Sequence, residues 1–192
     1  DVINFFDSCS LFLLEREEKS GLGSAYISGF KWSLEKAYDF IFEMDADFSH
    51  SPDDLIKLYN ACLDDNADIS VGSRYVKGIT VVNWPMSRII LSYGASRYVR
   101  FITRMKVKDS TAGFICYKRA VLEAINLNKI KFVGYAFQIE MKFKAYKKGF
   151  KIVEIPVLFK DRTKGKSKMS SGIISEAIFG VISLKLKSLF AK

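Results

Sequence analysis

The stretch FIFEMDADFSH, residues 40–50, is an apolar run that ends in two aspartates one residue apart. Its aromatic and β-branched start is typical of a buried β-strand. Side chains two residues apart on an extended chain point to the same face, so Asp45 and Asp47 should converge where the strand leaves its sheet. Open α/β sheets bind ligands at that edge. The stretch therefore predicts both a sheet and a binding site.

Two carboxylates held this close repel each other near neutral pH, and a hard divalent cation such as Mg²⁺ or Mn²⁺ is their usual partner. Two other interpretations stay open. A bare DxD pattern also occurs by chance at the start of a solvated loop. Haloacid-dehalogenase-type phosphatases place DxD after an apolar strand too, but in the first strand of their domain and with Thr or Val where this chain has Ser49.

Strand and helix patterns alternate along the chain. This alternation predicts a mostly parallel sheet with helices on both faces, an α/β fold. A helix should begin with Ser51 as N-cap and Pro52 at its first position. The other predicted helices are 21–37, 86–104 and 135–149, and the predicted strands are 10–16, 38–45, 67–75, 111–119 and 150–160.

The composition is that of a globular protein with excess positive charge. The 192 residues are 49% hydrophobic, and 30 Lys and Arg face 21 Asp and Glu, a formal charge of +9. This size predicts one catalytic or binding domain over residues 1–170, extended by an amphipathic helix over 171–192. The charge favours anionic partners, namely nucleic acid, phosphorylated substrates or an anionic lipid surface.

No segment has the pattern of an export signal or a membrane-spanning helix. The run at 11–14 is too short for a signal-peptide core, and charged residues interrupt the run at 173–190. Three widely spaced cysteines (Cys9, Cys62 and Cys116) predict the reduced thiols of a cytosolic protein rather than disulfides or zinc.

Three separate basic elements accompany the acidic pair: Arg74 after a strand, Arg88 in WPMSR, and the loop FKDRTKGKSKM at 159–169. Arginine pairs with phosphate oxygens through a planar fork, and lysine supplies a mobile point charge. With a divalent metal, these groups suit a reaction between a diphosphate leaving group and a phosphate nucleophile. A solvated face is expected for most of six other lysines, namely Lys129, Lys131, Lys142, Lys144, Lys147 and Lys148.

Six segments occur in an order that identifies a family: GLGSAYISGFKWSLEKAYDFIFEMDADFSHSPDDL, VGSRYVKG, NWPMSR, DSTAGF, GYAFQIEM and DRTKGKSKMS. Together they resemble bacterial members of the dolichol-phosphate mannosyltransferase family, also called polyprenol monophosphomannose synthases, within glycosyltransferase family 2. The resemblance covers nearly the whole chain. It implies the GT-A fold, a nucleotide sugar, usually GDP-mannose, with Mg²⁺ or Mn²⁺, and inverting transfer of the sugar to a polyprenyl (dolichyl or undecaprenyl) phosphate.

The resemblance also implies roles for individual residues. Asp45 and Asp47 would hold the metal and the donor diphosphate. The residues expected to contact the lipid phosphate are Arg74 and Arg88, joined by Arg162 and Lys168 from a loop that closes over the phosphates of donor or lipid. Gln138 and Glu140 match the lining of the sugar pocket, and Asp109 would orient the sugar or brace a loop. Gly21 and Gly23 match the segment near the nucleotide, although they fit a helix start equally well.

The sequence departs from the family in two places. The family's opening strand, helix and second strand, whose PTYNE-like and DDxS-like segments hold the base and ribose, are not found, so we expect an N-terminally truncated fold that binds nucleotide weakly. Ser49 stands where archaeal relatives place a longer Gln near the metal, which leaves metal coordination by residue 49 in doubt.

Several alternatives remain open at this point. Because the missing segment reads the base, a polyprenyl-phosphate glucosyltransferase or another family 2 enzyme that uses a UDP-sugar is the runner-up. A non-catalytic basic module for anionic membrane or nucleic acid would explain the charge, but not Asp45 and Asp47. The chain lacks the aromatic and basic alternation of RNA-binding modules, so we expect no nucleic-acid partner.

The C-terminal helix fits either a packed contact, including one within a homodimer, or a helix lying on a bilayer. Its apolar residues at helical spacing are Ile173, Ile174, Ala177, Ile178, Val181, Ile182 and Leu186. A lipid substrate makes a peripheral position at the cytoplasmic face of the membrane the expected location. A phosphate nucleophile is already anionic and needs no strong general base, so the single histidine, His50, is expected to be a helix-entry residue.

Overall fold

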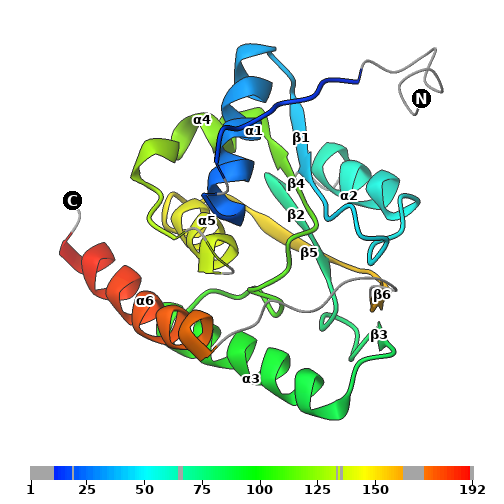
Figure 1. The fold of residues 1–192 in the computed structure, drawn as a ribbon, viewed down its shortest axis with the longest axis vertical. Helices are drawn as coiled ribbons and strands as arrows, with labels where there is room; N and C mark the ends of the chain where they lie inside the picture. Colours follow the sequence, from blue (N-terminus) through cyan, green and yellow to red (C-terminus); the bar gives the residue numbers. More distant parts are fainter. Residues whose placement is uncertain are drawn as a thin grey trace.

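The computed structural model describes residues 11–18, 20–64, 67–132, 134, 136–161 and 171–190. A central sheet carries helices on both faces, and two long helices, α3 and α6, lie along one side of the molecule (Figure 1). The helices are α1 (Leu22–Glu35), α2 (Asp54–Leu63), α3 (Met86–Thr103), α4 (Arg119–Ala124), α5 (Ala136–Lys147) and α6 (Ser171–Phe190), with a 3₁₀ turn at Leu127–Lys129.

The main sheet has the spatial order β1 (Phe40–Glu43), β4 (Ile115–Lys118), β2 (Ile69–Ser73) and β5 (Ile152–Pro156). A second, two-stranded sheet pairs β3 (Val81–Val82) with β6 (Phe159–Lys160) in parallel. The strands predicted at 38–45, 67–75 and 111–119 are thus confirmed with tighter bounds. The segment 150–160 forms two strands, β5 and β6, rather than one.

Strand direction agrees with the prediction for β1, β2 and β5 and departs from it for β4. β2 and β5 are parallel, whereas β4 is antiparallel to both of its neighbours, β1 and β2. Asp109 binds Arg74, which follows β2, so the chain before β4 is held at the carboxyl end of β2. β4 therefore starts there and runs back through the sheet. Hydrophobic alternation carries no information about this reversal.

Alternate residues of the sheet enter two separate cores. On one face Ile41 and Tyr117 pack with Phe30 of α1, beside α4 and α5. On the other face Cys116 packs with Leu58 of α2. Helices on both faces, as the strand and helix alternation predicted, are therefore confirmed.

Three helices meet at Phe132. The carboxylate of Glu140 on α5 accepts hydrogen bonds from the backbone N–H groups of Lys131 at 2.8 Å and Phe132 at 3.0 Å. A Cβ added to Gly23 on α1 would lie 2.7 Å from the carbonyl oxygen of Phe132, and one added to Gly180 on α6 would lie 2.5 Å from its ring. Glycine at these two positions therefore allows α1 and α6 to pack against the same residue.

α6 buries one stripe of its surface against α3 and α5. Val181 is buried and Leu184 is partly buried beside Phe143 of α5, and the hydroxyl of Tyr98 on α3 donates to the carbonyl of Ile178 at 3.0 Å. The exposed apolar residues of α6 are Ile178, Phe179, Ile182, Leu186, Leu189 and Phe190. The predicted C-terminal helix is confirmed, but Ile178, Ile182 and Leu186 lie outside its packed stripe. In the part of the chain that the structure describes, no helix is both long and apolar enough to cross a membrane.

Two local predictions are wrong. Residues 11–16 form no strand, since they have no neighbouring strand to pair with among the described residues; instead Phe12 packs on Trp32 with ring centroids 4.9 Å apart. Helix α2 begins at Asp54 rather than after Ser51, because Ser51 and Pro52 form a preceding turn in which the Ser51 hydroxyl accepts the Asp53 N–H at 3.4 Å.

Cys62 and Cys116 are buried free thiols, and Cys9 lies outside the described residues.

The close packing at Gly23 predicts a position-specific effect of alanine within α1. Gly23→Ala should lower the free energy of unfolding by about 1–3 kcal/mol, because its Cβ would meet backbone that must shift. Gly29→Ala in the same helix meets nothing within 4 Å and should raise stability by up to about 1 kcal/mol through helix propensity. Urea unfolding of both variants measures the contrast, and equal effects would contradict it.

Candidate active site

Two predicted acids and two predicted arginines line one pocket, beyond the carboxyl ends of β1 and β2. The residues that line it are Asp45, Asp47, His50, Gly72, Arg74, Trp84, Arg88, Thr111, Ala112, Gly113, Phe159 and Asp161. The structure thus brings together Asp45, Asp47, Arg74 and Arg88 from three separate segments, as expected from the position of strand ends in an α/β sheet.

The two aspartates of the opening stretch are held by contacts that leave each near the pocket. Asp45 accepts a hydrogen bond from the hydroxyl of Tyr26 at 3.3 Å, and Asp47 accepts one from the backbone N–H of Ser49 at 3.1 Å. Both acids are partly buried. Ser49 itself is buried and its carbonyl accepts the Lys160 N–H at 3.1 Å, which ties the DxD turn to β6.

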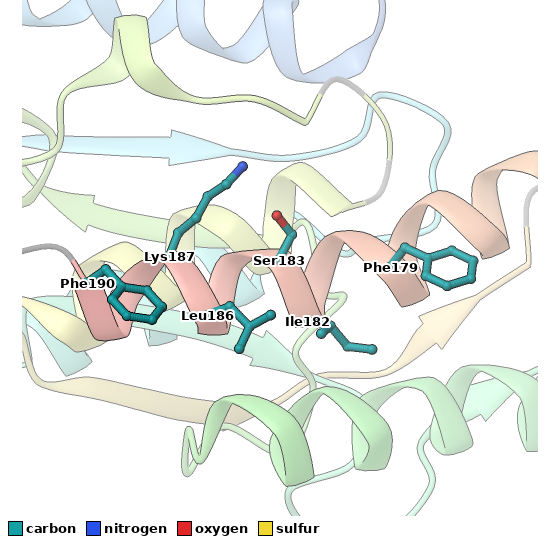
Figure 2. Close-up of a pocket in the computed structure, with 6 residues that line it drawn as sticks. All are labelled: Phe179, Ile182, Ser183, Leu186, Lys187 and Phe190. Atoms are coloured by element: carbon teal, nitrogen blue, oxygen red, sulfur yellow. The ribbon is translucent and has the colours of Figure 1, made fainter.

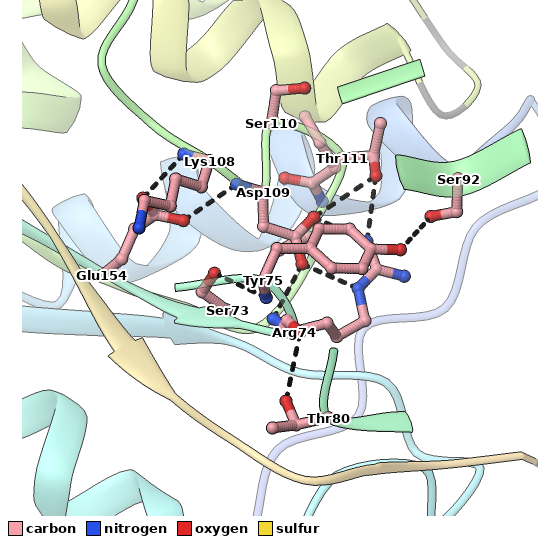
Figure 3. A network of polar contacts seen from close by, with 12 residues as sticks. Ser73, Arg74, Tyr75, Thr80, Ser92, Lys108, Asp109, Ser110, Thr111 and Glu154 are labelled. Carbon is pink, nitrogen blue, oxygen red and sulfur yellow. Dashed lines mark hydrogen bonds and ion pairs between the residues drawn. The ribbon is translucent and has the colours of Figure 1, made fainter. Parts of the chain in front are cut away.

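Arg74 is buried, and Asp109 engages its guanidinium in two hydrogen bonds (Figure 3). Nε donates to one carboxylate oxygen at 2.7 Å and Nη2 to the other at 2.6 Å, while Nη2 also donates to Thr111 at 2.9 Å. Burial alone disfavours both charges, but their attraction and hydrogen bonds outweigh it, so the pKa of Arg74 is raised and the pKa of Asp109 is lowered. The pair is therefore ionised at neutral pH.

The backbone around Asp109 is fixed in turn by β5. The carboxylate of Glu154 accepts the backbone N–H groups of Lys108 at 2.7 Å and Asp109 at 2.8 Å, as Figure 3 shows. Asp109 therefore acts as a brace for Arg74, the second of the two roles that the resemblance suggested.

Arg88 stands at the third residue of α3, on the face of an aromatic ring. Its guanidinium carbon lies 3.9 Å from the centroid of the Trp84 ring, and Nη1 donates to Asp161 at 2.7 Å. Arg74 lies 5.4 Å from the same ring. Trp84 therefore contacts both guanidiniums, and Asp161 pairs with that of Arg88 alone.

His50 lines the pocket but is packed between rings. Its imidazole lies 4.8 Å from the Phe114 ring and 5.1 Å from the Phe159 ring, and burial lowers its pKa. His50 is therefore packed against rings of β6 and of the chain before β4, and its expected role at the entry to α2 stays a prediction.

Negative groups outnumber positive ones in the described part of the pocket. Asp45, Asp47 and Asp161 line it, and the charge of Arg74 is matched by Asp109. Arg88 is the remaining cation of the described lining. A diphosphate bound beside Asp45 needs a positive charge next to it, such as a divalent cation, to limit repulsion between like charges.

A buried polar layer lies behind the pocket. Lys142 is fully buried and donates to the carbonyls of Ser110 and Ala112 at 3.3 and 2.6 Å, so its assignment to a solvated face is wrong. The helical pattern of α5 gave no signal for this, because α5 is covered on nearly all sides. Burial lowers the pKa of Lys142 to about 8 and raises that of the buried Glu43 to about 8.

The remaining predicted donor residues take different positions. The side chain of Gln138 lies under Gly113, where an added Cβ would be 3.2 Å from its Nε2, so it reaches the pocket wall. Glu140 braces the backbone at 131–132 and pairs with Lys144 at 2.8 Å, and it does not line the pocket.

Gly21 is the N-cap of α1 with φ of 97°, and Gly23 is packed against Phe132; neither lines the pocket. Gly21 fits the alternative of a helix start, and the predicted place of both glycines near the nucleotide stays a prediction.

Two predicted phosphate contacts, Arg162 and Lys168, lie outside the described residues. The sequence analysis did not assign roles to Trp84, Tyr26 or Thr111. A contact between Trp84 and Arg88 could have been predicted from the segment NWPMSR, because Trp84 stands immediately before the Pro-led helix that carries Arg88.

The buried ion pair predicts a large loss on removal of one partner. Asp109→Asn should lower the free energy of unfolding at neutral pH by about 3–5 kcal/mol, because it leaves the buried Arg74 charge unpaired. The lowered pKa of Asp109 means that its contribution is present above the usual Asp pKa and is lost as pH falls through the lowered value, so the difference should shrink in acid. Urea unfolding between neutral and acidic pH measures both effects.

The matched control is Glu123→Gln, which removes an exposed pair with Arg119 and should change stability by less than about 1 kcal/mol. Similar losses for the two variants would rule out the proposed importance of the buried pair.

Known proteins resemble the chain in sequence and fold. The model of glycosyl transferase family 2 matches residues 4–125. A polyprenol monophosphomannose synthase of Mycolicibacterium smegmatis is 44% identical over 94% of this chain and 68% of its own length. An undecaprenyl-phosphate mannosyltransferase of Micrococcus luteus is 45% identical over 90% of this chain and 70% of its own length.

A more distant relative and a solved structure extend the comparison. A dolichol-phosphate mannosyltransferase of Pyrococcus furiosus is 37% identical over 85% of this chain and 45% of its own length. The structure of glucosyl-3-phosphoglycerate synthase from Mycobacterium tuberculosis with UDP superposes with a TM-score of 0.52 at 12% identity, covering 90% of this chain and 56% of that one, which supports the GT-A fold. The chain therefore belongs to glycosyl transferase family 2, as a glycosyltransferase of the polyprenyl-phosphate mannosyltransferase group.

Proposed function

We propose that this glycosyltransferase transfers mannose from GDP-mannose to a polyprenyl phosphate, with Mg²⁺ or Mn²⁺ and with inversion at the anomeric carbon. The observation that carries the proposal is the meeting of Asp45 and Asp47 with Arg74 and Arg88 in one pocket. Mannose and polyprenyl phosphate are chosen because relatives that are 44–45% identical carry these terms in their names.

Asp45 and Asp47 fit a cation that shares its ligands with a substrate. Their carboxylate oxygens are the donor type that Mg²⁺ prefers, and among the described residues no three acidic, His or Cys side chains form a complete cage. Mg²⁺ commonly takes one or two carboxylates and completes its shell with water and substrate phosphates. When bound, the cation would supply the positive charge that a diphosphate leaving group needs.

Arg88 is the residue best placed to receive the acceptor phosphate. It is partly exposed and its guanidinium has N–H donors beyond the one that binds Asp161, whereas Arg74 is held by Asp109. A phosphate monoester is anionic at neutral pH and attacks without a strong general base. The residues of the pocket would therefore act by positioning and by balancing charge. Arg162 and Lys168 remain predicted contacts to the phosphates.

Replacement of the paired acids tests the metal and donor roles. We expect Asp45→Asn and Asp47→Asn to reduce transfer of labelled mannose from GDP-mannose to a short polyprenyl phosphate by about 100-fold or more, because the cation and diphosphate lose their anchor. Asp53→Asn, an exposed acid in the turn before α2, should leave transfer unchanged. The assay is run on the full-length protein with and without Mn²⁺, counting label in the organic phase.

The same assay separates the alternatives. Label transferred from UDP-glucose in place of GDP-mannose would assign the runner-up donor. Metal-independent transfer, or salt-sensitive nucleic-acid binding with no transfer at all, would contradict the proposal.

Replacement of Arg88 tests the acceptor role. Arg88→Ala should raise the KM for the polyprenyl phosphate by about tenfold or more and leave the KM for the nucleotide sugar within about twofold, because a charge-assisted contact to phosphate is lost. Arg119→Ala, which removes a partly exposed arginine on α4 away from the pocket, serves as the control. An unchanged dependence on lipid phosphate in Arg88→Ala would exclude Arg88 from this role.

A lipid acceptor also requires a way to meet the membrane, and we propose that the exposed faces of α3 and α6 provide it. The apolar residues of this surface, called the α3–α6 face below, are Met86, Ile90 and Phe101 of α3 and Phe179, Ile182, Leu186, Leu189 and Phe190 of α6. Several of the α6 side chains project from the helix in Figure 2. Exposed Arg97 and Lys187 lie on the same two helices and exposed Arg104 follows α3, so the face suits an anionic bilayer at the cytoplasmic side.

Vesicle binding tests the α3–α6 face. The double variant Phe179→Ser with Phe190→Ser should lose about tenfold in partitioning to phosphatidylcholine vesicles that contain phosphatidylglycerol, because two exposed aromatic anchors are removed. Ile56→Ser removes a similarly exposed apolar residue from α2 and should change nothing. A double variant that binds vesicles normally but loses a dimer in sedimentation would make the face a subunit contact instead.

A further inference from the structure

We propose that Trp84 is the positioning residue of the acceptor-phosphate site, holding the Arg88 guanidinium ready for a phosphate through the face of its indole ring. The inference rests on the proposed function, because it gives Arg88 the acceptor role. It adds a residue to which neither the sequence nor the family comparison assigned a part.

The geometry places two cations on one ring. The guanidinium carbon of Arg88 is 3.9 Å from the Trp84 ring centroid, and that of Arg74 is 5.4 Å away, both within the range of cation–π attraction. Two guanidiniums in one pocket repel each other. A shared ring with a negative face attracts both and so favours their close approach.

Contact through the ring face keeps the guanidinium edge available. The N–H donors of arginine lie in the guanidinium plane, while an aromatic ring meets the flat face of that plane. Trp84 therefore orients Arg88 without consuming the donors that a phosphate would use. Asp161 by contrast accepts one of those N–H groups at 2.7 Å and would compete with a phosphate for it.

The position of Trp84 is itself restricted. It follows Asn83, whose φ is 63°, and it precedes Pro85, the N-cap of α3, which limits its backbone to extended conformations. Its ring packs edge-on against Phe159 of β6 with centroids 5.2 Å apart. Because Arg88 is the third residue of α3 and its guanidinium lies against the Trp84 ring, a fixed ring restricts the direction in which Arg88 points.

Tryptophan at this position carries a polar group that the described structure leaves unpaired. The indole Nε1–H is buried and has no hydrogen-bond partner among the described residues, which is an unfavourable state that phenylalanine would avoid. Among aromatic side chains tryptophan attracts cations most strongly. The structure thus contains an unsatisfied donor on the residue that contacts both arginines, as expected if the ring is retained for its electrostatics.

The experiment compares Trp84→Phe and Trp84→Leu in the full-length protein. Trp84→Phe should unfold at an equal or higher urea concentration than the wild type, yet its KM for geranyl phosphate should rise about threefold to tenfold. Trp84→Leu, which has no ring, should raise that KM further, and both variants should keep the KM for the nucleotide sugar. Trp32→Phe, which changes the other tryptophan, in an aromatic cluster of α1, is the control.

A binding measurement separates this inference from the proposed function. In the 192-residue chain with Trp32→Phe, Trp84 is the sole tryptophan, so its fluorescence reports geranyl phosphate binding even if no sugar is transferred. We expect a saturable change that Arg88→Ala abolishes, and calorimetry should show weaker binding of the same compound to Trp84→Leu. An unchanged affinity in Trp84→Leu, an equal loss of donor and acceptor KM, or no binding to the wild type would overturn the role of Trp84. Absent transfer with intact geranyl phosphate binding would overturn the proposed function alone.

Discussion

The buried ion pair between Arg74 and Asp109 is the constraint on which the rest of the pocket depends. Its two hydrogen bonds of 2.6 and 2.7 Å hold the chain before β4 at the carboxyl end of β2, and this contact accounts for the reversed direction of β4. The same contact brings Thr111 and Gly113 to the pocket wall. A single charged contact therefore joins the topology of the sheet to the shape of the site. Removing either partner would leave a buried charge and a misplaced wall together.

Electrostatics also divides the work between the two arginines. Arg74 is paired with the buried Asp109 and contributes little net charge to a ligand. Arg88 is partly exposed and is paired with Asp161, the residue that follows β6. The sequence analysis treated the two residues as equivalent, since each is an arginine after a strand or before a helix. Their difference arises from burial and from partners far away in sequence, which local patterns do not encode. In the proposed function Arg88 is the charge that faces the ligand, while the predicted contact of Arg74 with a phosphate stays a prediction because Asp109 already pairs with it.

Local patterns were sufficient where a residue's role follows from its own segment. The alternation of apolar residues gave β1, β2 and β4, and the position of Asp45 and Asp47 after β1 gave the pocket. They failed where a distant contact decides the outcome. Residues 11–14 have the composition of a strand but no neighbouring strand among the described residues. Lys142 has the sequence context of a surface residue, but its ammonium group is buried and donates hydrogen bonds to the carbonyls of Ser110 and Ala112.

Residues that do not line the pocket can still determine its wall. Glu140 holds the backbone N–H groups of Lys131 and Phe132, and Gly23 and Gly180 bring α1 and α6 against Phe132, so α5 is fixed on several sides. Gln138 lies half a turn earlier on α5, with its amide 3.2 Å from where a Cβ of Gly113 would be. A rotation of α5 would move that amide out from under the pocket wall or into it. The motif around Glu140 therefore affects the site through the orientation of α5. Glu140 itself lies two residues after Gln138, on roughly the opposite side of the helix.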